Sequence, residues 1–366
     1  MAIQSIDIKE FLKLAHGFPV FDVRSPSEFL HAHIPGAINL PLFSDEERAV
    51  VGTAYKQESR AYAIKKGLDF FGPKMRGIIE TVEQILDKNP KNNSLHSGDT
   101  ILLHCWRGGM RSAGVAWLLD LYGFKVCTLQ GGYKIYRNWV REQFVSSYHI
   151  NVLGGFTGAG KTILLRELEK RGEKIIDLEG LASHKGSAFG KIGMPDQPSQ
   201  VMFENLLAFE LFNKSSSGQK IWMEDESQRI GHVNVPKTFW LTLNTSPVFF
   251  LDIPFEERLD HLVNEYGGLS KEQMVNAIIR IQKRLGGLET KNAINFLLEN
   301  NTRESFSILL KYYDKSYNKS LQNKKNAKQL VYTIPFQKNG EDNVEHLVEL
   351  VESMKHQGSR SENSES

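Results

Sequence analysis

Apolar positions in the first part of the chain come in short runs, and longer segments with helical spacing separate these runs. The predicted elements are strands at 19–24, 37–43, 100–105 and 125–129 and helices at 110–121 and 133–146. Strands that alternate with helices predict a mostly parallel sheet with helices packed against it.

The same pattern starts again near Tyr148. The second set of predicted elements comprises strands at 149–155, 174–178, 220–225 and 247–253 and a helix at 161–172. Helical spacing then prevails from Glu256 to about Leu321. We therefore predict an α/β domain at 1–145, a second α/β domain at 146–255, and a helical, basic part at 256–350 that packs on the second domain. The polar end, 351–366, is expected to be disordered.

Composition narrows the class of protein. The chain has 366 residues, 40% hydrophobic and 24% charged, which is typical of a globular protein with two domains of ordinary size. No apolar run reaches the length of a membrane span, and the N-terminal residues lack the pattern of a secretory signal. Two cysteines argue against a disulfide framework, so we expect a cytoplasmic protein without a membrane partner.

Charge is unevenly distributed along the chain. The formal net charge is +2, yet residues 280–330 hold 11 Lys and Arg against 4 Asp and Glu. A basic surface of this kind suits a polyanion, although solvated helix faces give the same pattern.

The stretch LLHCWRGGMRS at 102–112 places a thiol at the end of an apolar strand. Gly108 and Gly109 allow the chain to curl so that backbone N–H groups converge on the Cys105 sulfur at the start of the next helix. Arg107 and Arg111 add positive charge. A buried structural cysteine does not explain two flanking cations, so we predict a reactive thiolate beside an anion-binding loop.

GFTGAGKT at 155–162 matches the phosphate-binding pattern G-x-x-x-x-G-K-[ST], between a strand and a helix. Its backbone N–H groups wrap an anion, Lys161 meets the outer phosphates, and the Thr162 hydroxyl suits Mg²⁺. The expected phosphate-binding residues are Gly155, Thr157, Gly158, Gly160, Lys161 and Thr162. Both a nucleoside triphosphate and a diphosphate ester carry the group that such a loop binds.

A magnesium site in this domain needs an acidic side chain at the end of a neighbouring strand. Glu224, Asp225 and Glu226 follow the apolar run at 220–223, and we favour Asp225, with Glu224 as the next candidate. The loop at 183–190 is rich in small residues and suits a segment that lies against an anionic ligand, although a plain flexible loop fits as well.

Several motifs in the first half resemble the rhodanese domain. They are FDVRSPSEF at 21–29, HIPGAINLPL at 33–42, CWRGGMRS at 105–112 and LQGGYKIYR at 129–137, and together they cover about residues 10–140. The resemblance implies that Cys105 carries a transferable chalcogen as a persulfide-type group, and that Asp22 and Arg24 hold the active loop from an adjacent strand. It also implies a rhodanese-like fold for the first domain. Together with the phosphate-binding pattern, the predicted architecture is a rhodanese-like α/β domain followed by a P-loop NTPase-like α/β domain with a helical C-terminal part.

The whole chain resembles the tRNA 2-selenouridine synthase family. This resemblance rests on the order of the two halves and on five stretches of sequence. They are EERAVVGTAYKQESRAYAIKKGL, LEGLASHKGSAFG, PSQVMFEN, EDESQRIG and YYDKSY. The resemblance implies a transferase that converts wobble 2-thiouridine of tRNA to 2-selenouridine through an S-geranyl intermediate. Its implied co-substrates are geranyl diphosphate and selenophosphate, with Mg²⁺ and without haem, flavin or zinc.

The resemblance also gives the basic segment a partner. Lys and Arg side chains contact phosphates and Tyr side chains stack on bases, as suits a single-stranded tRNA loop. The expected tRNA-binding residues are Arg280, Lys283, Arg284, Lys311, Tyr312 and Lys315, with Tyr313 and Tyr317 interleaved. Nothing in the sequence fixes the oligomeric state, and we expect a monomer.

Three other functions use the same motifs. An ATP-dependent rhodanese-type sulfurtransferase would bind ATP at 155–162 and donate sulfur from Cys105 to RNA or to a small acceptor; the chain lacks the SGGxDS loop of adenylating enzymes. A small-molecule kinase with a rhodanese-like module would not need the reactive thiol. A non-catalytic scaffold would need neither active loop.

Overall fold

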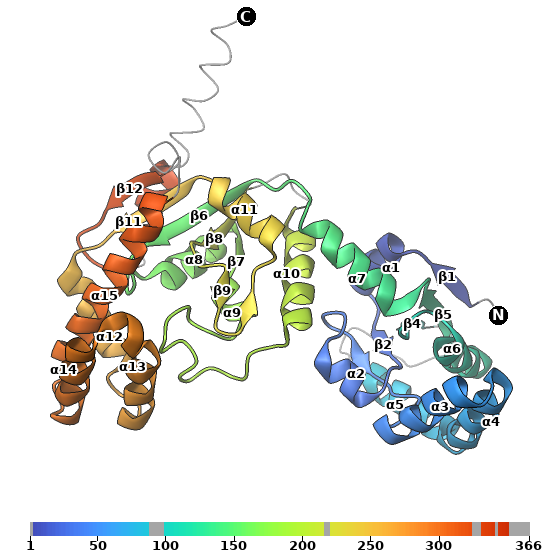
Figure 1. The fold of residues 1–366 in the computed structure, drawn as a ribbon. Coiled ribbons are helices and arrows are strands. Elements are labelled where there is room, and N and C mark those ends of the chain that lie inside the picture. Colours follow the sequence, from blue (N-terminus) through green and yellow to red (C-terminus); the bar gives the residue numbers. More distant parts are fainter. Residues whose placement is uncertain (1–2, 88–98, 216–219, 324–330, 341–342, 351–366) are drawn as a thin grey trace, which may run out of the picture. The chain divides into compact units, whose positions relative to one another are not determined.

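The computed structural model describes residues 3–87, 99–215, 220–323, 331–340 and 343–350 (Figure 1). The chain forms two compact units, one of residues 1–143 with 204–209 and one of residues 144–203 with 210–366. The polar tail predicted at 351–366 lies outside the described residues. Within them, every helix is too short or too polar to cross a membrane.

The first unit is built on a parallel five-stranded sheet of order β1-β5-β4-β2-β3. Its strands are β1 (Gln4–Ile6), β2 (Val20–Asp22), β3 (Ile38–Asn39), β4 (Thr100–His104) and β5 (Lys125–Leu129). Its helices are α1 (Ile8–Ala15), α2 (Pro26–His31), α3 (Asp45–Gln57), α4 (Arg60–Phe71), the 3₁₀ turn η1 (Gly72–Lys74), α5 (Met75–Asp87), α6 (Met110–Tyr122) and α7 (Gly132–Gln143). The predicted α/β class is confirmed here.

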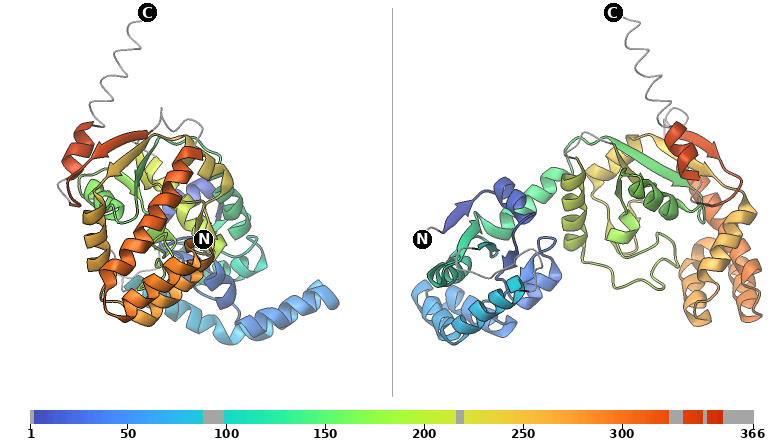
Figure 2. Two further views of the ribbon diagram at one scale, coloured as in Figure 1. Left: turned by 60° about the vertical axis from the view of Figure 1, so that its left-hand side comes forward. Right: turned by 180° about the vertical axis from the view of Figure 1, so that it is seen from behind.

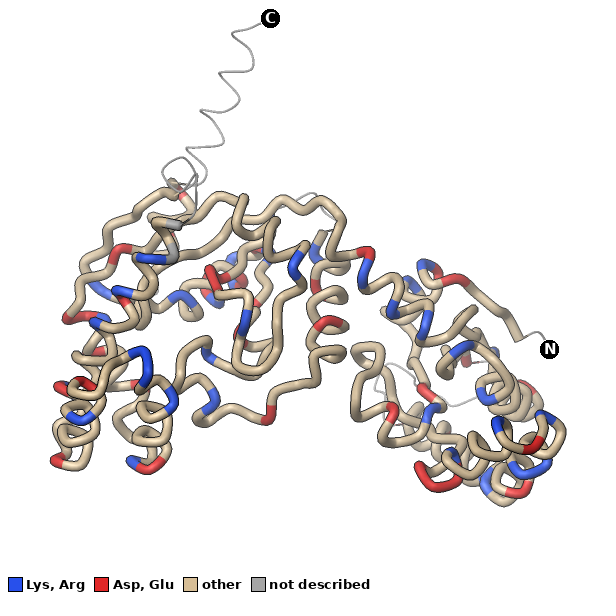
Figure 3. The backbone as a smooth tube through the Cα atoms, viewed as in Figure 1, with Lys and Arg blue, Asp and Glu red and all other residues tan. Residues whose placement is uncertain are grey.

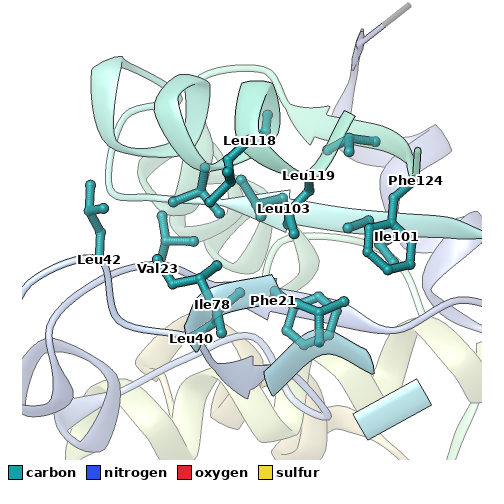
Figure 4. Close-up of a cluster of buried hydrophobic side chains, with 14 of the residues drawn as sticks. Phe21, Val23, Leu40, Leu42, Ile78, Ile101, Leu103, Leu118, Leu119 and Phe124 are labelled. Carbon is teal, nitrogen blue, oxygen red and sulfur yellow. The ribbon is translucent and has the colours of Figure 1, made fainter. Parts of the chain in front are cut away.

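Apolar side chains hold α5 and α6 against this sheet (Figure 4). Phe21 and Leu103 point from β2 and β4 into a cluster that Ile78 of α5 and Leu119 of α6 complete. All four are buried, and a fully buried side chain of this size contributes about 2 kcal/mol to folding. Because Cys105 belongs to the same cluster, the core fixes the end of β4 where the thiol lies.

The second unit contains another parallel sheet, of order β12-β11-β6-β8-β7. Its strands are β6 (Ile150–Gly155), β7 (Lys174–Ile176), β8 (Ile221–Glu224), β11 (Val248–Asp252) and β12 (Val331–Pro335), and β9 (Arg229–Ile230) pairs antiparallel with β10 (Val233–Asn234). Its helices are α8 (Lys161–Lys170), α9 (Leu178–Leu181), α10 (Gln200–Ser215, which also contributes 204–209 to the first unit), α11 (Lys237–Thr245), α12 (Phe255–Tyr266), α13 (Lys271–Leu285), α14 (Gly287–Leu298) and α15 (Thr302–Asn323).

Helices α12 to α15 pack on one another around a buried apolar cluster that also includes Phe189. The predicted helical range 256–350 nevertheless contains a strand, because β12 pairs in parallel with β11 along five residues and extends the second sheet. The last part of the chain therefore contributes both helices and a sheet edge to this unit.

Candidate functional site

The Cys105 thiol lies directly after β4, where the chain turns into α6. The Ser112 hydroxyl is 3.2 Å from its sulfur, and the Gly109 N–H donates to the sulfur at 3.4 Å. Burial alone raises the pKa of this thiol, but the Ser112 hydroxyl and the backbone N–H groups of Arg107, Gly109 and Ser112 outweigh burial and lower it. Cys105 is only 3% exposed, so its sulfur lies beneath the loop surface.

The two arginines of the loop have different surroundings. Arg111 donates to Glu28 at 2.7 Å, while Arg107 is exposed to solvent. The groups that lower the Cys105 pKa are a hydroxyl and backbone N–H groups, so the cationic stabilisation expected from both guanidinium groups is not the main cause. Both arginines remain at the loop surface, where an anion would approach.

The loop rests on a second glycine turn before α7. Gly132 has φ +60°, and a Cβ there would lie 2.4 Å from the Cys105 carbonyl oxygen and 2.5 Å from the Gly108 nitrogen. The Tyr133 N–H donates to the same Cys105 carbonyl at 2.8 Å. Close packing of two backbones therefore requires glycine at Gly132 and fixes the curve of the thiol loop.

Asp22 and Arg24 form a buried ion pair behind this loop, with N–O distances of 2.5 to 3.0 Å. Burial opposes ionisation of Asp22, but His104 and Arg24 hold its pKa below the usual range. The Arg24 guanidinium also lies 3.9 Å from the centre of the Tyr133 ring. The predicted pair thus contacts the thiol loop through Tyr133.

The phosphate-binding pattern spans the end of β6 and the start of α8, the position that the motif requires. Gly158 and Gly160 adopt φ +79° and φ +71°, which glycine tolerates. The Lys161 ammonium donates to the Gly155 carbonyl at 3.1 Å. All six predicted phosphate-binding residues line one cavity of about 840 Å³ in the second unit.

The acidic residues after β8 have separate positions. Asp225 and Glu226 line the cavity together with Lys161 and Thr162, whereas Glu224 does not. Glu224 is buried, one of its oxygens accepts from the Leu178 N–H at 3.1 Å, and burial and Asp177 raise its pKa well above the usual range. The arrangement favours Asp225 over Glu224 as the magnesium ligand.

Among the described residues, no group of three or more His, Cys, Asp or Glu side chains is placed to hold a metal ion. Thr162 and Asp225 nevertheless supply the oxygen donors that Mg²⁺ prefers when it also binds a phosphate ligand. The donor set therefore fits magnesium held jointly by the protein and a phosphate ligand.

Glu179 of α9 is a cavity residue that the sequence analysis did not single out. Burial and the neighbouring Glu226 raise its pKa to about 9, while Lys161 lowers it. The two carboxyl groups meet over Gly186, where a Cβ would lie 2.8 Å from Glu179 and 2.7 Å from Glu226. The pair therefore retains a proton at neutral pH beside Lys161.

Helix α15 supplies further residues that the sequence analysis missed or interpreted differently. The Tyr317 hydroxyl donates to Asp225 at 2.5 Å and accepts from the Gly155 N–H at 3.4 Å. Asp314 binds Arg258 through two bonds of 2.7 and 2.8 Å, and Arg258 donates to the Thr157 carbonyl at 3.1 Å. Tyr317 thus supports the phosphate loop, a role different from the base stacking expected for it.

The Tyr313 hydroxyl accepts from the Ala188 N–H at 3.1 Å, which ties α15 to the loop at 183–190. Lys185, Gly186 and Ser187 of that loop line the cavity, as a segment that lies against an anionic ligand should. Tyr313 is therefore also engaged within the unit and does not present a free ring for stacking.

The predicted tRNA-binding residues lie on α13 and α15. Their cations are exposed, and they are Arg280, Lys283, Arg284, Lys311 and Lys315. Arg284 and Tyr312 also line the cavity. Acidic residues also lie on α15 and on α12 (Figure 3), and Arg303 pairs with Glu256 and Asp260. This surface is less uniformly basic than the sequence count indicates.

Comparison with known proteins assigns each half of the chain to a domain family. The rhodanese-like domain family matches residues 7–138, and the tRNA 2-selenouridine synthase AAA domain family matches residues 148–350. The chain is also similar to the crystal structure of the N-terminal domain of a Clostridium difficile 630 protein named for ATP/GTP binding, at 39% identity over 37% of this chain and 98% of that chain, with a TM-score of 0.33.

Full-length relatives carry one name. A tRNA 2-selenouridine synthase of Sulfurovum sp. (strain NBC37-1) is 34% identical over 90% of this chain and 94% of its own length. One of Hydrogenovibrio crunogenus is 35% identical over 88% of this chain and 94% of its own. With both loops intact and both domain families matched in the same order, the chain belongs to the tRNA 2-selenouridine synthase family.

Proposed function

We propose that this protein converts the wobble 2-thiouridine of tRNA to 2-selenouridine through an S-geranyl intermediate. The single observation that supports the proposal is that the chain holds two loops of different chemistry, one in each unit, and that both suit an anionic ligand. One is a hydrogen-bonded thiol loop at Cys105, and the other is a phosphate loop that opens into a cavity of about 840 Å³. The names of the full-length relatives supply the reaction class.

The first step takes place at the phosphate loop. The sulfur of 2-thiouridine attacks the first carbon of geranyl diphosphate, the carbon–oxygen bond breaks, and pyrophosphate leaves while the base loses its ring N–H proton. Lys161 and the loop N–H groups stabilise the charge on the leaving group. Magnesium held by Thr162 and Asp225 would neutralise further charge on the diphosphate.

The second step uses the thiol loop. Selenium from selenophosphate attacks C2 of the S-alkylated base, the carbon–sulfur bond breaks, and the geranyl thiol leaves. Water takes up the phosphoryl group as phosphate. Arg107 and Arg111 bind the selenophosphate anion, and the Cys105 thiol orients its selenium toward C2 of the base without forming a bond to it.

Nucleoside mass spectrometry tests the proposal. Purified protein is incubated with 2-thiouridine tRNA, geranyl diphosphate, selenophosphate and Mg²⁺. We expect S-geranyl-2-thiouridine first and 2-selenouridine later. Lys161→Ala should abolish both products, whereas Cys105→Ala should accumulate the S-geranyl nucleoside and stop there.

Cys127→Ser is the matched control, because Cys127 is the other free cysteine and is buried in β5, away from the loop. It should leave both products unchanged. Loss of geranylation in Cys105→Ala would contradict the division of roles. If the tRNA stays unmodified and the protein consumes added ATP, the result would favour the ATP-dependent sulfurtransferase.

A further inference from the structure

The helices α3 and α4 form a hairpin, defined by residues 45–71, that projects from the body of the first unit (Figure 2). Ser44 and Ser59 cap the two helices by accepting bonds from the N–H groups of Glu47 and Tyr62. Only Ala54, Ala63 and Phe71 are buried along the hairpin. Most of its surface therefore faces solvent.

This surface carries large apolar side chains that a folded monomer normally covers. Tyr55 is 56% exposed, Tyr62 46% and Leu68 56%, and Val50 and Ile64 are exposed as well. Five large exposed apolar side chains on one short hairpin favour an interaction surface. The aromatic members have a flat ring available for stacking on a base.

The hairpin as a whole carries five cationic and five acidic side chains, but four of the acidic ones lie toward the start of α3 and the end of α4. Between residues 52 and 68, where both tyrosines lie, there are four cationic side chains, Lys56, Arg60, Lys65 and Lys66, against one acidic side chain, Glu58. The Lys66 ammonium lies 5.9 Å from the centre of the Tyr62 ring. Lys and Arg interleaved with exposed tyrosines is the combination that binds a nucleic-acid backbone and its unstacked bases.

The base of the hairpin adjoins the thiol loop. One oxygen of Glu28 accepts from Arg111 of that loop at 2.7 Å and lies 3.7 Å from Arg48 of α3. At the end of α4, a Cβ at Gly114 of α6 would lie 3.8 Å from the Phe71 ring, so the base of the hairpin also packs against α6. A polyanion bound along the hairpin would therefore reach the loop that carries Cys105.

We infer that the α3–α4 hairpin is the surface on which the first unit docks tRNA, so that the wobble base is delivered to Cys105. The inference rests on the proposed function for its substrate and goes beyond it by naming the surface. Phosphates contact Lys56, Arg60 and Lys65, and anticodon bases stack on Tyr55 and Tyr62. This binding surface is distinct from the basic surface of α13 and α15, which belongs to the second unit.

Direct binding tests the inference without any chemistry. The dissociation constant of full-length protein for 2-thiouridine tRNA is measured by filter binding between 50 and 300 mM KCl. A variant that combines Lys56→Ala, Arg60→Ala and Lys65→Ala should bind about ten-fold or more weakly near 100 mM salt. The slope of log Kd against log salt should fall by about 2 to 3, since each lost phosphate contact removes about 0.9 from it.

A matched variant removes the same charge from the same unit. Lys9→Ala, Lys13→Ala and Arg141→Ala lie on α1 and α7, which contact each other, and these side chains are exposed. This variant should change the dissociation constant by less than about two-fold. Tyr55→Ala with Tyr62→Ala should weaken binding and leave the salt slope unchanged. Circular dichroism and the alkylation rate of Cys105 confirm that each variant is folded.

The outcomes separate the two claims. Wild-type protein that fails to bind tRNA at any salt concentration would overturn the proposed function and this inference with it. Wild-type protein that binds tRNA, with equal losses in the hairpin and α1–α7 variants, would overturn the hairpin alone. Unchanged tRNA affinity in the hairpin variant would also overturn the inference, because the cations of the hairpin would then make no contact with tRNA.

Discussion

The Ser112 hydroxyl, 3.2 Å from the Cys105 sulfur, comes from the first turn of α6 and lies seven residues from the thiol. The Glu28 partner of Arg111 is 83 residues away. The sequence places the Cys105 loop between a strand and a helix, and the structure agrees, because strand, glycines and helix are consecutive. It could not predict that Arg111 is paired with a carboxylate, since that contact depends on the folded path of α2.

Replacing Ser112 by alanine tests the origin of the thiolate. The hydroxyl is the first of the groups that lower the Cys105 pKa, so its removal should raise that pKa and slow alkylation by iodoacetamide at pH 7 by roughly ten-fold. The measurement is the alkylation rate against pH in a Cys127→Ser background. An unchanged profile would assign the thiolate to the backbone N–H groups alone.

Asp22→Asn tests the buried ion pair. The variant leaves Arg24, which is 1% exposed, without a charged partner, and should lower the free energy of unfolding at pH 7 by about 3 kcal/mol. Because the folded pKa of Asp22 is below its unfolded value, near 3.9, this stabilisation is present above about pH 4 and is lost as pH falls further.

Urea titrations from pH 3 to pH 7 measure the free energy of unfolding of wild type and Asp22→Asn. The difference between the two free energies should shrink toward pH 3. A difference that stays constant across this range would mean that the Asp22 carboxylate contributes through shape and not through its charge.

At the scale of elements, strands bounded by clear turns were predictable, including the edge strands β3 and β7, whereas the edge strands β1 and β12 were not. β4 and β6 are continuous apolar runs that end in glycine-rich loops, and both lie where predicted. β1 has three residues, and β12 becomes a strand only by pairing with β11 some eighty residues earlier. Short-range patterns do not contain such pairings.

The turn before α7 is an element whose geometry admits one residue type. Gly132→Ala places a methyl group 2.4 Å from the Cys105 carbonyl oxygen at φ +60°, so either the turn or the thiol loop must move. We expect a loss of at least about 1 kcal/mol in unfolding free energy and a marked loss of Cys105 alkylation.

The matched control is Gly77→Ala in α5. A Cβ at Gly77 meets no atom within 4 Å, and alanine has the higher helix propensity, so this variant should be neutral or slightly more stable. Thermal unfolding and alkylation rates compare the two variants. Equal behaviour of both would show that the backbone contact at Gly132 does not constrain the loop.

At the scale of the whole molecule, the two reactions of the proposed function use residues of different units. Cys105 belongs to the first unit, and Lys161 with its cavity belongs to the second. The sequence indicated this division because each loop is a short, local motif. The supports of the phosphate loop, Arg258 and Tyr317, were not predictable, because they come from α12 and α15.

This division predicts complementation between two inactive proteins. Cys105→Ala retains the phosphate loop and should convert 2-thiouridine tRNA to the S-geranyl form. Lys161→Ala retains the thiol loop and should convert S-geranyl tRNA to 2-selenouridine. Because the intermediate is attached to a tRNA that can dissociate, a mixture of the two proteins should form 2-selenouridine although neither does so alone.

Nucleoside mass spectrometry of the mixture, with each protein alone as control, measures this complementation. The double variant Cys105→Ala with Lys161→Ala, incubated with the same substrates at the same concentrations, should form neither S-geranyl-2-thiouridine nor 2-selenouridine. If the mixture accumulates S-geranyl-2-thiouridine and no selenium product, while Lys161→Ala alone converts purified S-geranyl tRNA, the intermediate stays bound to the protein that made it. If Lys161→Ala cannot convert purified S-geranyl tRNA, the second step also needs the phosphate loop, and the separation of the two steps between the units is wrong.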